Sequence, residues 1–308
     1  MRKVTTLGDV YNRADEMAKT YSDSMVNIDD VSFENLDTLV ISGEQKTIAV
    51  TAQRLIAARL NIPYPYLKRC PADIQAENLN HWISKERNDS LFFRFDGDTV
   101  RAVFTPKYKP VDNLPVIERV LSLGYGSDAE VSCSIDKDFM SLSILNGSNS
   151  FDIDGDEFRP GISVSNSEVG LSSVTIAAFI FRLICTNGLI QKNEIGSSFR
   201  HISSRILDEI PGIFKSTSMD LIKQQRQLRL SLNSRVEDTE ATFDSFNRQF
   251  QLSPEEKTAL GWAWPYEAGT SMFNIINAYT RASQYDGLPA SSSHKLEKTG
   301  GAILAMVN

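Results

Sequence analysis

The segment 158–190 constrains the fold of this chain more than any other, because it joins a β-like run, a polar loop and an almost wholly apolar run. The apolar run extends from Val174 to Cys185 and contains one charged residue, Arg182. Such a run followed by Asn187-Gly188 predicts a buried helix, since glycine favours the left-handed residue that ends a helix. At about 12 residues it is shorter than the roughly 20 that span a membrane. We therefore expect a core helix with the polar loop at its N-terminus.

Residues in and after this loop are similar to the first signature of a family found on phages, plasmids and integrated elements, known as domain of unknown function 932. The signature combines Asn166-Ser167 with the run Phe181-Arg182-Leu183-Ile184-Cys185-Thr186-Asn187-Gly188-Leu189. Members usually read Asn-Ser-His-Asp-Gly in the loop, whereas this chain reads Asn166-Ser167-Glu168-Val169-Gly170, so no role of that histidine transfers. The resemblance implies a signature loop formed by Asn166, Ser167, Asn187 and Gly188.

A second signature of the same family, an Arg-Ala strand followed by Tyr-x-Pro-x-x-Asn, resembles residues 100–113. The strand here is Val100-Arg101-Ala102-Val103-Phe104, and the motif is Tyr108-Lys109-Pro110-Val111-Asp112-Asn113. The resemblance spans roughly residues 60–300 and implies a protein of a phage or another mobile element. It implies no mechanism, so the function has to be argued from the residues.

The charge of the chain is acidic overall but unevenly distributed. The net charge is −7, which argues against a strongly basic protein that coats nucleic acid without specificity. Between positions 182 and 235 there are nine Lys and Arg residues against four Asp and Glu, and between 54 and 110 there are ten against six. This asymmetry predicts one basic face on an otherwise acidic protein.

Cysteine spacing and the first residues of the chain indicate its compartment. Cys70, Cys133 and Cys185 form neither a metal pattern nor a disulfide pattern, which favours a reducing environment. The N-terminal sequence lacks the apolar core of a signal peptide, and no segment is apolar for long enough to span a membrane. We expect a protein of the bacterial cytoplasm with no membrane partner. Walker, dinucleotide and hydrolase motifs are absent from the sequence, so we expect no cofactor and favour a protein that is not an enzyme.

The order of the predicted elements is hairpin, helix, hairpin, helix and β-meander, followed by helices. The clearest hairpin covers 91–104, where Asp96-Gly97 joins two alternating runs, and its second run should turn Arg101 away from Val100 and Ala102. This order predicts an α+β fold with a largely antiparallel sheet covered by helices and a long-helix C-terminal part. The predicted domains are an N-terminal helical arm (1–30), an α+β core (31–203) and a helical C-terminal region (204–308).

The region 216–250 is predicted to be one long amphipathic helix. Its apolar seam has steps of four and three, as in a coiled coil, and consists of Leu228, Leu232, Val236, Thr239, Phe243, Phe246 and Phe250. The seam is longer than a small sheet needs to cover. We therefore expect this helix to mediate self-association, which makes the protein a homo-oligomer.

Basic and aromatic residues occur together in the pattern of proteins that bind single strands, where bases stack on rings and phosphates pair with cations. The candidate nucleic-acid-binding residues are Arg101, Lys107, Tyr108, Lys109, Arg182, Lys223, Arg226 and Arg229. An ordinary strand edge or the solvated face of a helix can carry the same mixture of basic and aromatic residues, so a structural role is the alternative for these residues. For Arg182 an ion pair with Glu168 or with an Asp of 152–156 is the favoured alternative, because an unpaired buried charge is costly.

The acidic run Asp152-Ile153-Asp154-Gly155-Asp156-Glu157 is the densest group of carboxylates in the sequence. Asp152, Asp154 and Asp156 are weak candidates for cation ligands, but the spacing does not match an EF-hand, and a solvated turn is favoured. Cys185 with His201 lacks the third group that a nucleophile and base would need, so a structural cysteine is favoured.

Three functions remain open at the level of the sequence. The first is a non-enzymatic accessory protein of a mobile element that binds single-stranded nucleic acid in DNA transactions such as recombination. The second is an inhibitor that binds a host protein of an anti-phage defence or restriction system. The third is a metal-dependent enzyme that uses the acidic run 152–157.

Overall fold

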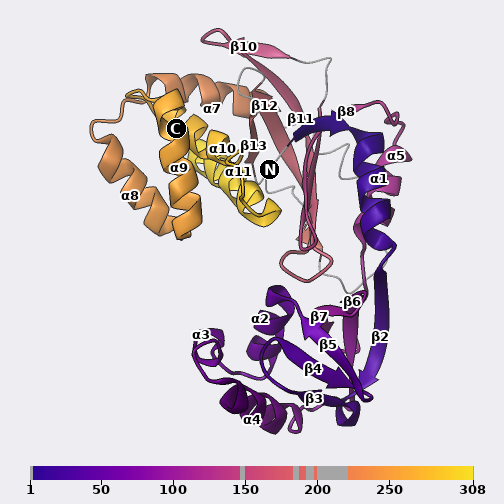
Figure 1. Cartoon of the computed structure of the whole chain (residues 1–308). Coiled ribbons are helices and arrows are strands. Elements are labelled where there is room, and N and C mark those ends of the chain that lie inside the picture. Colours follow the sequence, from indigo (N-terminus) through magenta and orange to yellow (C-terminus); the bar gives the residue numbers. More distant parts are fainter. Residues whose placement is uncertain (1–2, 146–149, 183–186, 192–197, 200–220, 308) are drawn as a thin grey trace.

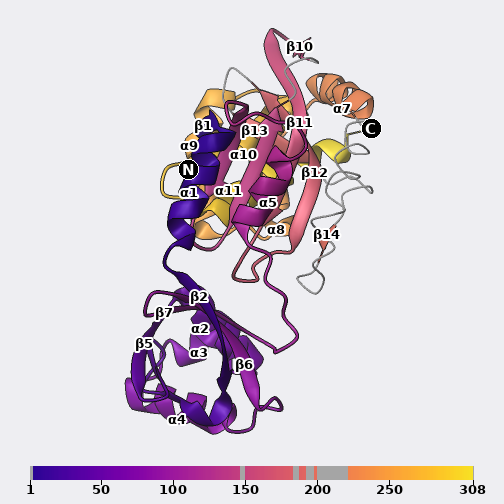
Figure 2. The ribbon, with the colours of Figure 1, turned by 90° about the vertical axis from the view of Figure 1, so that its right-hand side faces the viewer.

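The computed structural model describes residues 3–145, 150–182, 187–191, 198–199 and 221–307, which form two lobes (Figure 1). The small lobe comprises residues 21–104, and the large lobe comprises residues 3–18 and the described residues between 113 and 307. The chain passes between the lobes twice, from α1 into β2 and from β7 into α5, as Figure 2 shows from a second direction. Each lobe has its own, largely antiparallel sheet and the C-terminal part is helical, so the predicted α+β class is confirmed, with two sheets instead of one.

The small lobe contains a six-stranded sheet with the order β2-β6-β7-β5-β4-β3. Its strands are β2 (Tyr21–Asn27), β3 (Val31–Phe33), β4 (Thr38–Ile41), β5 (Glu44–Ile48), β6 (Ser90–Asp96) and β7 (Thr99–Phe104). Its helices are the short 3-10 helix η1 (Ile28–Asp30), α2 (Val50–Arg59), α3 (Tyr64–Leu67) and α4 (Ala72–Ile83). The predicted hairpin is present as β6 and β7, which pair antiparallel, while β5 joins β7 in parallel.

The large lobe contains an eight-stranded sheet with the order β1-β8-β9-β11-β12-β13, to which β10 and β14 add on β11 and β12. Its strands are β1 (Lys3–Thr6), β8 (Glu130–Ile135), β9 (Met140–Leu145), β10 (Phe151–Ile153), β11 (Asp156–Asn166), β12 (Val174–Arg182), β13 (Asn187–Gln191) and β14 (Ser198–Phe199). Its helices are α1 (Leu7–Ala18), α5 (Asn113–Leu121), α7 (Leu221–Asn233), α8 (Thr239–Gln249), α9 (Pro254–Glu267), α10 (Met272–Ala282) and α11 (Ala290–Ala305).

Helices cover both faces of the large sheet: α1 and α5 lie on one side and α7 to α11 on the other (Figure 1). Alternate apolar residues of β8, β9 and β11 pack with α1 and α5 in one core cluster. The intervening positions are serines that are buried as well, namely Ser132, Ser134, Ser141, Ser143, Ser163 and Ser165. Alternation of apolar and polar residues usually marks a solvated face. Here α11 covers the serine face, and His294 of α11 contacts Ser141.

The prediction of a core helix at 174–185 is wrong, because this run forms β12. The strand pairs antiparallel with β11 and with β13, in which Gly188 lies opposite Phe181. A strand covered by helices on both faces is apolar throughout, and short apolar runs of this kind do not distinguish a strand from a buried helix. β-branched and aromatic residues such as Val174, Ile176 and Phe179 fit the strand, and all three are buried. Residues 183–186 lie outside the described ranges.

The prediction of one helix over 216–250 is also wrong. α7 ends at Asn233 and α8 begins at Thr239, after an N-cap in which Asp238 accepts a hydrogen bond from Ala241. The connection pairs with the segment before α10, where the amide of Val236 donates to the carbonyl of Thr270 at 2.8 Å. The seam residues Leu228 and Val236 belong to a core cluster of the large lobe, and Phe243, Phe246 and Phe250 are partly buried against that cluster. The seam therefore packs inside the chain and does not support self-association, which stays a prediction.

Two further predictions concern the start of α9 and the N-terminal segment. The capping box of α9 is present, with Ser253 and Glu256 exchanging side-chain and backbone hydrogen bonds. The predicted N-terminal arm instead packs into the large lobe, since Leu7, Val10 and Ala14 are buried. The structure thus places residues 3–18 with the large lobe, rather than in a separate arm. Within the described ranges, none of the helices has the length and hydropathy needed to cross a bilayer.

Candidate functional site

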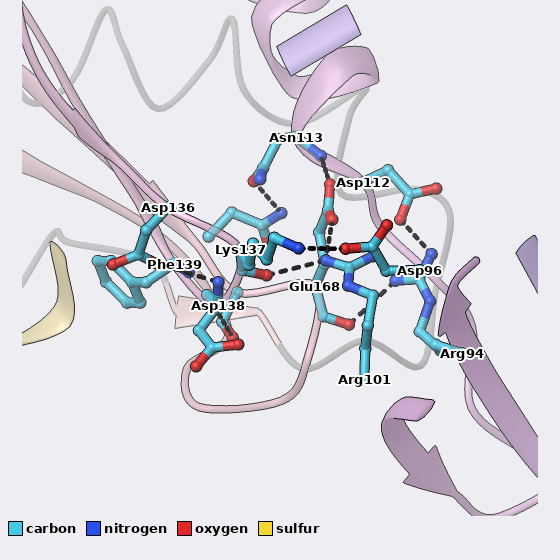
Figure 3. Close-up of polar contacts among 12 residues, drawn as sticks. Arg94, Asp96, Arg101, Asp112, Asn113, Asp136, Lys137, Asp138, Phe139 and Glu168 are labelled. Atoms are coloured by element: carbon cyan, nitrogen blue, oxygen red, sulfur yellow. Dashed lines mark hydrogen bonds and ion pairs between the residues drawn. The ribbon is translucent and has the colours of Figure 1, made fainter. Parts of the chain in front are cut away.

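The two segments that carry the family resemblance meet at the junction of the lobes, around Glu168 (Figure 3). Glu168 follows β11 and is 5% exposed. Its Oε2 accepts a hydrogen bond from Arg101 Nη2 at 2.8 Å, and its Oε1 accepts one from the backbone amide of Asn113 at 2.8 Å. Its carbonyl oxygen accepts one from Arg94 Nη1 at 3.0 Å. One residue of the signature loop therefore contacts both the Arg-Ala strand and the Asn of the second signature.

A β-bulge places Arg101 at this junction. Arg94 pairs with Ala102 and Phe95 pairs with Val100, so Arg101 is the extra residue of β7. Bulges redirect side chains and break the alternation of a strand. Arg101 is buried at 3% exposure, and Val100 and Val103, which strict alternation would put on opposite faces, both belong to the core of the small lobe, so the predicted alternation of this run fails.

The guanidinium of Arg101 is incompletely satisfied. Its Nη2 also donates to the carbonyl of Lys137 at 2.9 Å, and its Cζ lies 3.4 Å from the centroid of the Tyr21 ring. Its Nε and Nη1 are buried without a hydrogen-bond partner, as is the hydroxyl of Tyr21. Burial raises the pKa of Tyr21 to about 12, with Arg101 acting in the opposite direction. Tyr21 therefore stays protonated at neutral pH.

Arg94 is the second buried arginine of the junction. Its Nε donates to Asp23 Oδ1 at 2.9 Å, and its Nη2 donates to Asp112 Oδ1 at 2.5 Å. Burial alone would lower the pKa of Arg94, but the hydrogen bonds and charges of Asp23 and Asp112 outweigh it and raise the pKa above its ordinary value. Arg94 is therefore a permanent cation that ties β2, β6, the segment before α5 and the Glu168 loop together.

Contacts from the β8–β9 turn complete the junction. Lys137 Nζ donates to Asp96 Oδ2 at 2.5 Å, and Thr20 Oγ1 donates to Asp96 Oδ1 at 2.5 Å. These two hydrogen bonds lower the pKa of Asp96. Thr51 at the start of α2 donates to Asp138 Oδ2 at 2.7 Å. We call Asp23, Arg94, Asp96, Arg101, Asp112, Lys137 and Glu168 the junction cluster.

Asn166 and Ser167 shape the loop that carries Glu168. Asn166 Nδ2 donates to the carbonyl of Val111 and to Asn113 Oδ1, both at 2.9 Å. Ser167 Oγ donates to the carbonyl of Asp138 at 2.7 Å and accepts from the amide of Leu171 at 3.0 Å. Both residues are buried, so the role of this part of the signature loop in the structure is to fix the backbone on either side of Glu168.

Gly170 ends the same loop where the backbone needs a glycine. Its φ is +81°, and a Cβ at this position would lie 2.7 Å from Cε1 of Phe104. The ring of Phe104 is itself stacked on Tyr108, with centroids 3.8 Å apart and planes 7° from parallel. The loop thus fits closely against an aromatic pair of the second signature.

The junction is held by polar contacts. The hydrophobic core clusters found among the described residues each stay within one lobe. A cavity of about 390 Å³ lies beside the junction cluster and is lined by Tyr21, Arg94, Asp112, Leu114 and Glu168, among others. Polar interfaces between parts of one chain permit relative motion more readily than apolar ones. The arrangement is suited to electrostatic positioning of the lobes, because its carboxylates pair with Arg94, Arg101 and Lys137.

Arg182 is part of a separate ion-pair network. Its Nε donates to Asp156 Oδ2 at 2.6 Å and its Nη1 donates to Glu267 Oε2 at 2.7 Å. Glu267 also accepts from Arg281 Nε at 2.7 Å. The expected ion pair with an Asp of 152–156 is confirmed, whereas Glu168 pairs with Arg101.

The other candidate residues are distributed over several surfaces. Lys107 and Lys109 are exposed after β7, and Tyr108 is largely buried between Phe104 and the junction cluster, where burial raises its pKa. Arg226 and Arg229 are exposed on α7. The side chain of Lys223 and those of Asn187 and Gly188 lie outside the described set, although the backbones of the last two pair with β12.

The acidic run 152–157 covers the end of β10, the turn at Asp154-Gly155 and the start of β11. Asp152 Oδ1 accepts the amide of Gly155 at 3.1 Å, and Asp156 is committed to Arg182. Within the ranges the structure covers, no group of three or more His, Cys, Asp or Glu could hold a metal ion. The favoured reading of this run as a turn agrees with the structure.

Comparison of the chain with protein-family models, curated proteins and solved structures found no match. Membership of the family that the two signatures resemble therefore stays a prediction.

Sequence reasoning missed several members of the junction cluster, namely Asp23, Arg94, Asp96 and Lys137. Arg94 had a signal in the sequence, because it is a single charge within Leu91-Phe92-Phe93-Arg94-Phe95. Arg182 carries the same signal, because it is the single charge of the apolar run 174–185. The partners of Arg94 have no such signal in the sequence, since they lie up to 74 positions away from it.

Proposed function

We propose that this chain is a non-enzymatic protein of a phage or another mobile element that binds single-stranded nucleic acid. The observation that carries the proposal is a shallow groove of about 330 Å³ on α7, lined by Gln225, Arg226, Arg229, Leu230 and Asn233. Guanidinium groups match the geometry of phosphate oxygens, and amide side chains are common donors to phosphate and sugar. Two exposed arginines flanked by two amides on one helix therefore suit a phosphate backbone.

Lys107 and Lys109 supply further exposed positive charge, on the segment that leaves the small lobe. Arg101, Tyr108 and Arg182 have a different part in this proposal. Each of these side chains makes a polar contact inside the protein, so they hold the scaffold and do not contact the nucleic acid.

A salt series tests the proposal. Fluorescence anisotropy with a labelled oligothymidylate should show binding that weakens with salt, by about 0.7 in the log–log slope for each phosphate contact. The double variant R226Q/R229Q should flatten that slope by about 1.4. The matched control R13Q/R248Q removes two exposed charges from α1 and α8 and should leave the slope unchanged. Absence of binding by the parent at low salt, or equal slopes for the two double variants, would contradict the proposal.

A second candidate function, binding of a host defence protein, is favoured by one exposed aromatic patch. Trp262 is 37% exposed and Tyr266 is 63% exposed, with ring centroids 5.6 Å apart. Arg281 lies over the Tyr266 ring, with its Cζ 4.7 Å from the centroid. Trp, Tyr and Arg carry much of the binding energy of protein interfaces.

The same patch gives this alternative its own test. W262A/Y266A should abolish protection of a phage from host restriction in a plating assay, while oligothymidylate binding stays as in the parent. Unchanged protection by this variant would remove the support that the patch gives to the inhibitor function.

A further inference from the structure

β2 is the longest edge strand in the described part of the chain. It is the first strand of the small sheet and pairs with β6 on one side only (Figure 1). It has seven residues, whereas β3 at the opposite edge has three and β1 at the edge of the large sheet has four. Proteins usually keep edge strands short, or interrupt them with proline, lysine or a bulge, because an open edge can pair with another chain. β2 contains neither proline nor lysine, and its register with β6 is continuous from Tyr21 to Asn27.

The backbone groups on the open side of β2 follow from the hydrogen bonds at its two ends. The amide of Ile28 donates to the carbonyl of Asp89 at 2.9 Å, and the amide of Gly97 donates to the carbonyl of Thr20 at 2.8 Å. Both bonds fit one register, in which the even-numbered residues of β2 are bonded to β6. Bonded and unbonded residues alternate along an antiparallel pair, so the odd-numbered residues direct their amides and carbonyls away from the sheet. These residues are Tyr21, Asp23, Met25 and Asn27.

The strand also exposes apolar surface. Met25 is 49% exposed although its side chain is large and apolar. It lies opposite Phe92 of β6, so a further strand would add a side chain to the same row of the sheet. The edge therefore offers backbone hydrogen bonds together with an apolar contact, which are the contributions that bind an extended peptide by strand addition.

The charge around β2 selects the partner. The segment 20–45, which contains β2 to β4, has six Asp and Glu residues and no Lys or Arg. Asp29 and Asp30 follow β2 directly, and Asp89 lies close to them because its carbonyl accepts the amide of Ile28. All three side chains are exposed, and none forms an ion pair with another described residue. A second copy of β2 would bring like charges together at this edge, whereas a basic segment would be attracted to it.

We propose that the open edge of β2 binds an extended, basic segment of another protein as a seventh strand of the small sheet. The segment pairs with the outward groups of Asp23, Met25 and Asn27, and its Lys or Arg residues lie near Asp29 and Asp30. Antiparallel pairing is the more stable arrangement per residue, so the basic residues belong near the N-terminus of the bound segment. The proposal does not depend on nucleic-acid binding, which is assigned to α7.

Two synthetic peptides that differ only in charge test the proposal. Isothermal titration calorimetry at low salt with acetyl-Lys-Lys-Thr-Val-Thr-Val-Thr-amide should give saturable binding. The charge-reversed acetyl-Glu-Glu-Thr-Val-Thr-Val-Thr-amide should bind at least about tenfold more weakly. D29N/D30N should weaken binding of the basic peptide about threefold to tenfold, as expected for the loss of two exposed ion pairs. The matched control D73N/E77Q removes two exposed carboxylates from α4 in the same lobe and should leave the affinity unchanged.

Hydrogen exchange of the β2 amides, followed by nuclear magnetic resonance, locates the bound peptide. In the free protein the even-numbered amides should exchange slowly, since they donate to β6, and the outward amides of Asp23, Met25 and Asn27 should exchange fast. The basic peptide should slow exchange of the outward amides and leave the others unchanged. M25P removes an outward donor and keeps the hydrogen bonds to β6, so it should weaken binding of the basic peptide about tenfold.

Each outcome decides the proposal. Slower exchange of the outward amides, with weaker binding by D29N/D30N than by D73N/E77Q, supports it, and circular dichroism confirms that the variants are folded. Equal affinity for the two peptides, absence of binding at millimolar basic peptide, or slower exchange only outside β2 would overturn it. A dimer in sedimentation that M25P dissociates would also overturn it, because a second copy would then occupy the edge. If M25P does not fold, hydrogen exchange and D29N/D30N decide in its place.

Discussion

Arg101 and Glu168 form a buried ion pair across the junction of the two lobes, with Nη2 and Oε2 2.8 Å apart although 67 positions separate the residues in the sequence. Arg101 belongs to a bulged strand of the small lobe, and Glu168 belongs to a loop of the large sheet. Arg101 lies in the segment 100–113 and Glu168 in the loop after β11, which are the two segments that sequence analysis singles out. The ion pair therefore joins these two segments across the junction of the lobes.

Gly170 should tolerate a side chain poorly. G170A combines a positive φ with a Cβ 2.7 Å from Phe104. The backbone strain should lower the free energy of unfolding by roughly 1 kcal/mol, and the steric contact should lower it by about 1–3 kcal/mol more. The matched control is G155A, which has a φ of +82° and nothing within 4 Å of the added carbon. Urea unfolding of both variants measures the difference.

A second substitution separates the two causes. F104L in the G170A background should restore part of the lost stability, since the smaller side chain gives the added carbon room. Equal losses in G170A and G155A would show that the loop does not lie against Phe104.

The ion pair of Asp96 with Lys137 should make the free energy of unfolding fall as the pH is lowered through the acidic range. Hydrogen bonds from Lys137 and Thr20 lower the pKa of Asp96 from its ordinary value of 3.8. A carboxyl with a lowered pKa in the folded state contributes stability above its unfolded pKa and loses it as the pH falls through the folded pKa. D96N should thus be less stable than the parent at pH 7, by about 1 kcal/mol or less because Lys137 is exposed, and the two should converge below about pH 3.8.

Denaturant midpoints between pH 2.5 and pH 7 give this difference directly. D286N, in the loop between α10 and α11, is the control and should show no such convergence. A difference between D96N and the parent that stays constant over the whole range would contradict the role assigned to Asp96.

Features set by local chemistry could be predicted from the sequence. The hairpin of β6 and β7 follows from two alternating runs around Asp96-Gly97, and the start of α9 follows from Ser253 and Glu256. The ion pair of Arg182 followed from the cost of an unpaired charge in an apolar run. These signals lie within a few residues or in one side chain, so no knowledge of distant partners was required.

Features set by distant partners could not be predicted. The sequence predicts a helix where β12 forms, because this strand carries apolar residues on both of its buried faces and so lacks the polar alternation that reveals a strand. The break between α7 and α8 depends on hydrogen bonds of Val236 with Thr270 and of Ser234 with Met272, at the start of α10. The burial of Arg101 depends on a bulge that adds one residue without a mark in the sequence.

Arg182 should be costly to remove. It is shared by Asp156 and Glu267, and in R182M Asp156 would lose its partner inside the protein while Glu267 keeps Arg281. Loss of one partner of a buried pair costs about 3–5 kcal/mol. R159M is the control, because Arg159 is half exposed and lies 3.5–3.8 Å from its carboxylates, so it should change stability by less than about 1 kcal/mol. Equal unfolding free energies for R182M and the parent would show that the network does not support the fold.

The central claim is that the buried pair of Arg101 and Glu168 holds the two lobes together. A double-mutant cycle of R101M, E168Q and R101M/E168Q, measured by urea unfolding, isolates their mutual contribution from their other contacts. The account predicts a coupling free energy of about 2 kcal/mol, so that the double variant is less destabilised than the sum of the two single variants by that amount. A coupling below about 0.5 kcal/mol, the range of independent sites, would contradict it.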